Sequence, residues 1–198
     1  MRGFDGAKVD RIAARARINK AMLYYHFKSK AALYNEILRG IFEAVAETVA
    51  SAREAGSEPE DKIRAFIRAV AREAAARPHF PPIWLREMAE GGRHLDDSIV
   101  AAASRVLGTL AAIIAEGRQA GRFGDAHPMA VHIGIVAPLV FFAASAPVRA
   151  RVAGSSARRS AALSPAAIVA QVEAATLAVL AQGAGSTATG KRKGRRRS

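Results

Sequence analysis

The chain has 198 residues, a formal net charge of +13 and no cysteine. Its length suits a small head joined to a larger body, and the absence of cysteine excludes disulfide frameworks and thiolate metal sites. Abundant alanine with little alternation of β-branched residues predicts an all-α fold. The N-terminus has no apolar export segment, so we expect a cytoplasmic protein.

Positive charge gathers at the two ends of the chain. Residues 1–30 hold eight Lys or Arg and two Asp, which gives +6, and residues 191–198 hold six Lys or Arg without an acid. The 160 residues between them contribute +1. Charge concentrated in this way is typical of phosphate binding, so the N-terminal segment is expected to meet nucleic acid.

Two short helices joined by a tight turn are predicted near the N-terminus. The first has its apolar residues at the spacing i, i+3, i+4, i+7, namely Val9, Ile12, Ala13 and Ala16. Asn19 suits the N-cap of the second helix, in which Leu23 and Phe27 repeat at i, i+4. The spacing alone fits an ordinary helical hairpin as well as a DNA-binding helix-turn-helix.

The outward residues of the second helix favour DNA. Lys20, Ala21, Met22, Tyr24 and Tyr25 lie off the Leu23/Phe27 stripe and form a small, partly apolar surface with hydrogen-bond donors. A helix face that is merely solvated would carry more charge.

At these residues the chain resembles the tetracycline-repressor (TetR) family of bacterial transcription regulators. The resemblance rests on Ile12-Ala13, Leu23-Tyr24-Tyr25-His26-Phe27 and Ser29-Lys30. It implies a helix-turn-helix head over residues 1–40, a helical ligand-binding and dimerisation body over 41–182, and a disordered basic tail over 183–198. It also implies a bacterial protein that associates with the nucleoid. For the tail, nonspecific DNA affinity, contact with an acidic membrane surface and no specific role all remain open.

The resemblance also implies which residues contact DNA. Lys20, Ala21, Met22 and Tyr25 would lie nearest the base edges, and Tyr24, His26 and Lys30 would bind phosphates. Tyr24 has an alternative role as a cover over the core of the head. The full expected set is Lys8, Asn19, Lys20, Ala21, Met22, Tyr24, Tyr25, His26 and Lys30.

Three departures from the family pattern stand in the head. Family members carry one more helix before Gly3-Phe4, so we expect either a start site upstream or a fragment with a weakened head. Arg17 stands where the family often has Gly, and Lys8 where it often has a Ser or Thr cap; each change costs on the order of 1 kcal/mol.

The body is predicted to consist of six further helices, of which one covers the apolar stretch 129–146 described below. Ser29 caps a long one that ends near Gly56, with Leu33, Ile37, Ile41, Val45 and Val49 on its buried face. Another starts at Pro59, buries Ile63, Phe66, Ile67 and Val70, and stops at Arg77-Pro78. Residues 78–95 are expected to be irregular, with a short helix over 83–88.

Two more long helices are predicted. Residues 96–120 form a helix whose buried face consists of Ile99, Ala103, Val106, Leu110, Ile113 and Ile114. The last helix runs over 164–182, and its apolar stripe consists of Ile168, Val169, Val172, Thr176, Val179 and Leu180.

Residues 129–146 carry no charge over eighteen positions, which is long enough to raise the question of a membrane span. His132, Gly134, Pro138 and Ser145 interrupt this stretch, and no second span is evident. We therefore expect a buried helix and no stable membrane insertion.

For the body, the resemblance implies a homodimer through the last two long helices and a small-molecule inducer that releases a palindromic DNA operator. Aromatic and other apolar residues could wall the inducer pocket and two polar ones could act as handles, although most of them would serve equally well as core. These candidates are Phe66, Phe80, Trp84, Met88, Arg118, His132, Phe141 and Phe142.

Enzyme and metal signatures are weak. The chain has no Gly-rich phosphate loop, nucleophile elbow or HExxH motif, and His94-Leu95-Asp96-Asp97 is explained by a turn in which Asp96 or Asp97 caps the next helix. We therefore expect no enzyme activity, no cofactor and no metal. The hypotheses that remain are a ligand-controlled repressor, a dimeric ligand-binding remnant without specific DNA binding, and a membrane-associated helical protein.

Overall fold

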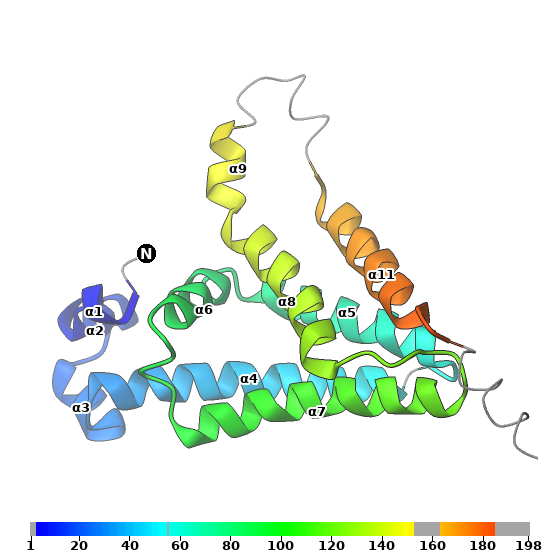
Figure 1. Cartoon of the computed structure of the whole chain (residues 1–198). Coiled ribbons are helices and arrows are strands. Elements are labelled where there is room, and N and C mark those ends of the chain that lie inside the picture. The colour runs from blue at the N-terminus through cyan, green and yellow to red at the C-terminus, as the bar shows by residue number, and fades with distance from the viewer. Residues whose placement is uncertain (1–2, 55, 153–162, 185–198) are drawn as a thin grey trace, which may run out of the picture.

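The computed structural model describes residues 3–54, 56–152 and 163–184, and within these ranges the fold is all-α, as predicted (Figure 1). Most of the expected basic tail lies outside the described residues. The helices are α1 (Gly3–Gly6), α2 (Val9–Ala16), α3 (Lys20–Phe27), α4 (Lys30–Glu54), α5 (Pro59–Ala76), α6 (Phe80–Ala89), α7 (Asp97–Gln119), α8 (Pro128–Ala144), α9 (Ala146–Val152) and α11 (Pro165–Ala181).

The long helix α4 joins the two parts of the molecule. Figure 1 shows α1, α2 and α3 gathered at the N-terminal end of α4, while α7 runs alongside the rest of it. Helices α5, α8 and α11 pack on one another, and α5 also packs on α4. Because α4 is continuous from Lys30 to Glu54, one helix contacts both the head and the body core.

The main core lies in the body, between α4, α5, α7, α8 and α11. Its cluster of seventeen buried residues is centred on side chains such as Phe66, Ile67, Leu110 and Ile135, all fully buried. The apolar faces predicted for the second body helix and for the 96–120 helix are confirmed, since all their named residues are buried except Ala103, which is half-buried.

Helix starts follow the predicted caps. The Asn19 side chain accepts a hydrogen bond from the backbone N–H of Ala21 at 2.9 Å, and Ser29 Oγ accepts from that of Ala32 at 3.0 Å. Asp96 accepts from Ile99, also as predicted, and Ser164 accepts from Ala167, a cap that was not predicted. These contacts satisfy N–H groups that have no partner inside the helix.

Both small departures in the head have the expected structural form. Arg17 adopts a left-handed backbone conformation with φ 57° and ψ 37°, and Lys8 makes no side-chain cap hydrogen bond to α2. Lys28 also has positive φ, 58°, which the sequence reading missed.

The buried stripe predicted for α4 is wrong in part. The buried residues are Leu38, Phe42, Ala46 and Val49, whereas Ile37 is 49% exposed and Leu33, Ile41 and Val45 are half-buried. Leu38, Phe42 and Ala46 have the same four-residue spacing shifted by one position, so the buried face is rotated by about 100° around a helix with 3.6 residues per turn.

Residues 78–95, which were predicted to be irregular, are also more regular than expected. Instead of a short helix over 83–88, α6 begins at Phe80 and includes Pro81 and Pro82 in its first turn. Proline fits there because the N–H groups of a first turn have no partner within the helix.

The apolar stretch 129–146 is divided rather than continuous, because α8 ends at Ala144 and meets α9 at a bend of 59°. It is not a buried helix throughout: Ile133 is 57% and Phe141 66% exposed. The expectation of no second span is wrong by length and composition, since α7 is long and apolar enough to cross a membrane. However, α7 packs on α4, α5 and α8 and supplies Val106, Leu110 and Ile113 to the core.

Candidate DNA interface and ligand cavity

The head is held together by a small hydrophobic cluster. Val9 and Ala13 from α2 and Leu23 from α3 are buried, and Ile12, Phe27 and Leu33 pack against them. Leu33 belongs to α4, so the cluster also fixes the head to the joining helix. Burial of Leu23 and partial burial of Phe27 direct the opposite face of α3 outward.

That opposite face carries most of the residues expected to meet DNA. Met22 is 52% exposed, Tyr25 is 83% exposed and Tyr24 is 42% exposed, and Ala21 and His26 are exposed too. The rings of Tyr25 and His26 lie edge to face, 5.4 Å apart. The result is an apolar and aromatic surface on one helix, with hydroxyl and imidazole groups at hand to donate hydrogen bonds.

Two of the expected cationic contacts have partners within the protein. Lys20 Nζ lies 2.7 Å from Asp10 Oδ1, and the hydrogen bond to Asp10 raises the pKa of Lys20. Lys30 Nζ lies 4.3 Å from the centre of the Phe4 ring. Asn19 uses its side-chain oxygen as a cap, and Lys8 is exposed.

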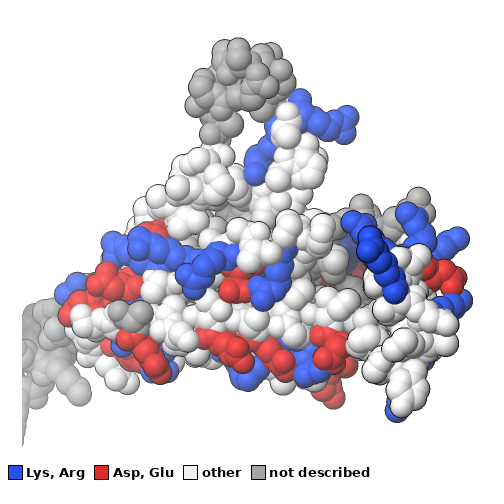
Figure 2. All heavy atoms as spheres, turned by 180° about the vertical axis from the view of Figure 1, so that it is seen from behind, with Lys and Arg blue, Asp and Glu red and all other residues white. Residues whose placement is uncertain are grey.

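The end of the molecule formed by the head is rich in Lys and Arg (Figure 2). Lys8, Arg11, Arg15, Arg17 and Lys28 are exposed in the described head. These cations lie on or beside α2 and at the C-terminal end of α3, and positive charge of this kind attracts a phosphate backbone.

A buried carboxylate connects the body to the head end of α4. Glu87 of α6 is 1% exposed and accepts hydrogen bonds from Tyr34 Oη of α4 and from the backbone N–H of His94, both at 2.9 Å. His94 Nδ1 lies 3.2 Å from Glu87 Oε2, and the Phe4 ring lies against both His94 and Tyr34.

These contacts shift the pKa values of Tyr34 and Glu87. Burial and the hydrogen bond to Glu87 raise the pKa of Tyr34. Burial alone would raise the pKa of Glu87, but hydrogen bonds from the His94 backbone, Tyr34 and the His94 ring outweigh it and lower that pKa. Glu87 is therefore an ionised acceptor at neutral pH that ties α6 to α4.

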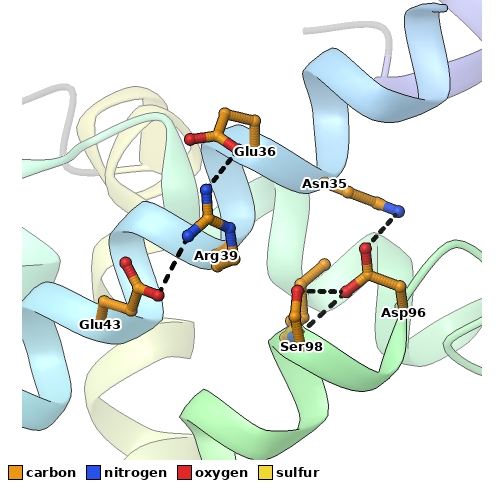
Figure 3. A network of polar contacts seen from close by, with 7 residues as sticks. Asn35, Glu36, Arg39, Glu43, Asp96 and Ser98 are labelled. Carbon is orange, nitrogen blue, oxygen red and sulfur yellow. Dashed lines mark hydrogen bonds and ion pairs between the residues drawn. The ribbon is translucent and has the colours of Figure 1, made fainter. Parts of the chain in front are cut away.

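A second polar link joins α4 to the start of α7 (Figure 3). Asn35 Nδ2 donates to Asp96 Oδ2 at 3.1 Å, while Asp96 Oδ1 accepts from Ser98 Oγ at 2.6 Å. The hydrogen bonds from Ser98 and Ile99 lower the pKa of Asp96. On α4, Arg39 pairs with Glu36 and with Glu43. Asp96 thus acts as the cap of α7 and as a tie to the joining helix, and among the described residues no group of three or more His, Asp or Glu could hold a metal ion.

A cavity of about 90 Å³ lies within the body, lined by residues of α4, α5, α6, α7 and α8. Three of the residues expected to hold the inducer line it together: Phe80, Trp84 and His132. The sequence reading missed its other principal walls, Phe42 and Glu73. Phe42 could have been found from its position on the α4 face one turn from Leu38, but Glu73 gives no signal in the sequence.

The other five expected ligand residues lie away from this cavity. Phe66 is fully buried in the main core, while Met88 is 45% and Phe141 66% exposed. Phe142 packs against Arg149, and Arg118 pairs with Asp125 at 3.2 Å beside a different surface hollow.

Family models match both parts of the chain. The model described as bacterial regulatory proteins, tetR family, matches residues 1–37, and a tetracyclin repressor-like C-terminal domain matches residues 59–167. The second match alone spans more than half of the chain.

Curated relatives agree. The chain is 29% identical over 125 residues to the HTH-type transcriptional repressor NicS of Pseudomonas putida, across 62% of this chain and 59% of NicS. It is 28% identical over 156 residues to the HTH-type transcriptional regulator RutR of Escherichia coli, across 79% of this chain and 73% of RutR.

Solved structures share the fold. A tetR-family regulatory protein from Rhodococcus RHA1 superposes with a TM-score of 0.70 at 18% identity, covering 91% of this chain and 88% of the other. PfmR of Thermus thermophilus has a TM-score of 0.66 at 19% identity, covering 92% and 91%. With the matching family models and the helix-turn-helix head, these likenesses show that the chain belongs to the TetR family of bacterial regulatory proteins.

Proposed function

We propose that this protein is a ligand-responsive transcriptional regulator that represses by binding a palindromic DNA operator as a homodimer and is released by a small-molecule inducer. The observation that carries the proposal is the exposed face of α3, held outward by the buried Leu23 in a head that also exposes several Lys and Arg side chains. Its relatives' names, a transcriptional repressor and a transcriptional regulator, support the same role. In this reading the protein acts in the bacterial cytoplasm.

The proposed DNA contacts follow the exposure of α3. Met22 and Ala21 offer apolar contact with a thymine methyl group, and Tyr25 stands furthest into solvent. Lys20 donates to a base or phosphate after exchanging its Asp10 partner. The sugar-phosphate backbone on either side of these base contacts is bound by Tyr24, His26, Lys30 and Lys8. Such contacts set the affinity for DNA rather than the preference for a sequence.

The proposed dimer uses the outer faces of α8 and α11. These adjacent helices expose large apolar side chains that a second copy would cover, among them Ile133 at 57%, Phe141 at 66% and Val179 at 49%. Two-fold symmetry would then set two α3 helices on successive major grooves. Covering this face also accounts for the apolar length of α8 without membrane insertion.

The proposed coupling runs along α4. Phe42 and Val45 of α4 line the cavity, whereas Tyr34 and Leu33 of the same helix contact Glu87 and the head cluster. A ligand that displaces α4 at the cavity changes the angle of the head and hence the spacing of the two α3 helices. Ligand and operator then favour different positions of α4, so binding of one lowers the affinity for the other.

A direct test begins with the full chain and a pool of random duplexes. After selection of the bound sequences, we expect a two-fold symmetric site and an affinity that falls steeply with salt. Tyr24→Phe combined with Lys30→Ala should weaken binding to all duplexes alike, while Arg72→Ala on α5 serves as the matched control. Unchanged affinity in the double variant would reject the phosphate clamp.

A further inference from the structure

The cavity in the body has an apolar wall with two polar residues, Glu73 and His132. Three aromatic rings belong to this wall: Phe42 lies edge to face with Trp84 at 4.8 Å and with Phe80 at 5.5 Å. Aromatic rings favour offset or edge contacts with another ring, so this wall fits a flat ring better than a long chain.

Glu73 already has partners for both of its oxygens. Thr48 Oγ1 donates to Oε1 at 3.0 Å, and Arg77 Nη1 pairs with Oε2. Thr48 and Arg77 therefore hold this carboxylate from within the protein. No Lys or Arg is among the described residues that line the cavity, so a bound anion would lack a counterion there.

His132 is different, because its Nδ1 is buried and has no hydrogen-bond partner in the described part of the chain. Burial lowers the pKa of His132, so the ring stays neutral at neutral pH. A buried polar atom without a partner costs free energy that a bound molecule can recover. A hydroxyl group suits this atom in either imidazole tautomer, since it both donates and accepts.

The volume limits the size of the occupant. An apolar cavity of about 150 Å³ is known to take a benzene molecule, and this one measures about 90 Å³. A single ring therefore enters only if the walls shift outward, and two fused rings would require a much larger displacement.

We propose that the inducer is an uncharged, single-ring aromatic molecule with one hydroxyl group, which contacts Phe42, Phe80 and Trp84 and hydrogen-bonds to His132 Nδ1. Only the word inducer, that is, the effect of this molecule on DNA binding, rests on the proposed function. The binding itself is a property of the cavity and can be measured without DNA.

The single tryptophan of the chain lines the cavity, so its fluorescence reports occupancy directly. The full chain is titrated with phenol, with toluene, which has a methyl group in place of the hydroxyl, and with benzoate, which is charged. Phenol and toluene should both change the Trp84 emission with saturation, and benzoate should bind at least tenfold more weakly than phenol.

The deciding quantity is the ratio of phenol affinity to toluene affinity. His132→Leu should lower this ratio about five- to tenfold, the worth of one neutral hydrogen bond. His132→Asn keeps a polar group near the Nδ1 position and should retain most of the ratio, and His79→Gln on the exposed start of α6 should leave it unchanged. If circular dichroism shows that His132→Leu is not folded, His132→Ala removes the same group.

Ala103→Leu fills the cavity from α7 and should abolish binding of both rings. The proposal is overturned if the ratio is unchanged in the folded His132 variants, if benzoate binds as tightly as phenol, if binding survives Ala103→Leu, or if neither ring binds the folded wild-type chain. DNA binding is measured on the same samples. Loss of ring binding with DNA binding intact overturns this inference alone, whereas ring binding without DNA binding overturns the proposed function alone.

Discussion

The head and the body of this protein are stabilised in different ways. The head cluster has three buried residues, Val9, Ala13 and Leu23, while the main core of the body has seventeen. The head relies more on local structure, namely a cap at Asn19 and a left-handed turn at Arg17. It also relies on Leu33 of the joining helix α4, which packs against the head cluster. The head is therefore a short sequence motif that depends on α4 for support, whereas the body is stabilised by its own packed core.

The largest expected effects test this difference directly. Leu110→Ala removes a fully buried side chain from the body core and should lower the free energy of unfolding by about 3–5 kcal/mol, visible as a lower midpoint for the whole chain. Leu23→Ala should cost about 2–3 kcal/mol in the head, leave the main transition in place and remove DNA binding. A single shared transition shifted equally by both variants would show that head and body are one cooperative unit.

The next largest effect is expected at the hydrogen bond between Tyr34 and Glu87, which connects α4 to α6. Tyr34→Phe leaves the buried Glu87 without one of its donors and should cost about 1–2 kcal/mol in thermal or denaturant unfolding. It should also weaken the response of DNA binding to ligand, because α6 and α4 are then less firmly connected. Tyr24→Phe, an exposed tyrosine of α3, is the matched control and should leave stability unchanged.

The same tie predicts a pH dependence. The pKa of Glu87 is lowered in the folded protein, so its stabilising contribution is present above the ordinary glutamate pKa near 4.5 and is lost as the pH falls through the lowered value. The melting temperature of the wild-type chain should therefore decline below about pH 4.5. Glu87→Gln should start lower at pH 7 and decline less, and parallel curves for the two proteins would contradict this assignment.

The smallest effect is expected at the turn of the head. Arg17→Gly relieves a left-handed conformation and should stabilise the head by up to about 1 kcal/mol, while removing one cation from the DNA-facing end. Hydrogen exchange in α2 and α3 measures the stability, and the salt slope of DNA binding measures the lost charge. Faster exchange in α2 and α3 would argue that Arg17 makes a stabilising contact.

The sequence predicted what depends on near neighbours along the chain. The caps at Asn19, Ser29 and Asp96 and the positive φ of Arg17 need only residues within one turn. The stripe on α4 was partly wrong because its neighbours, α5 and α7, come much later in the sequence and select which face is buried.

The cavity was only partly predictable for the same reason. Phe80, Trp84 and His132 were named as aromatic or polar residues on body helices, and Phe66 and Phe141 satisfied the same criterion. What separates them is the meeting of five helices around one small volume, and no local pattern encodes it. Glu87 was missed because a glutamate in an amphipathic helix normally lies in solvent.

The central claim is that the exposed face of α3 reads DNA sequence. The most direct measurement compares the affinity of the full chain for its selected duplex with that for a scrambled duplex, before and after Met22→Ala combined with Tyr25→Ala. We expect the double variant to bind both duplexes with the affinity that the wild-type chain has for the scrambled one. An unchanged preference for the selected duplex in a folded double variant would contradict the claim.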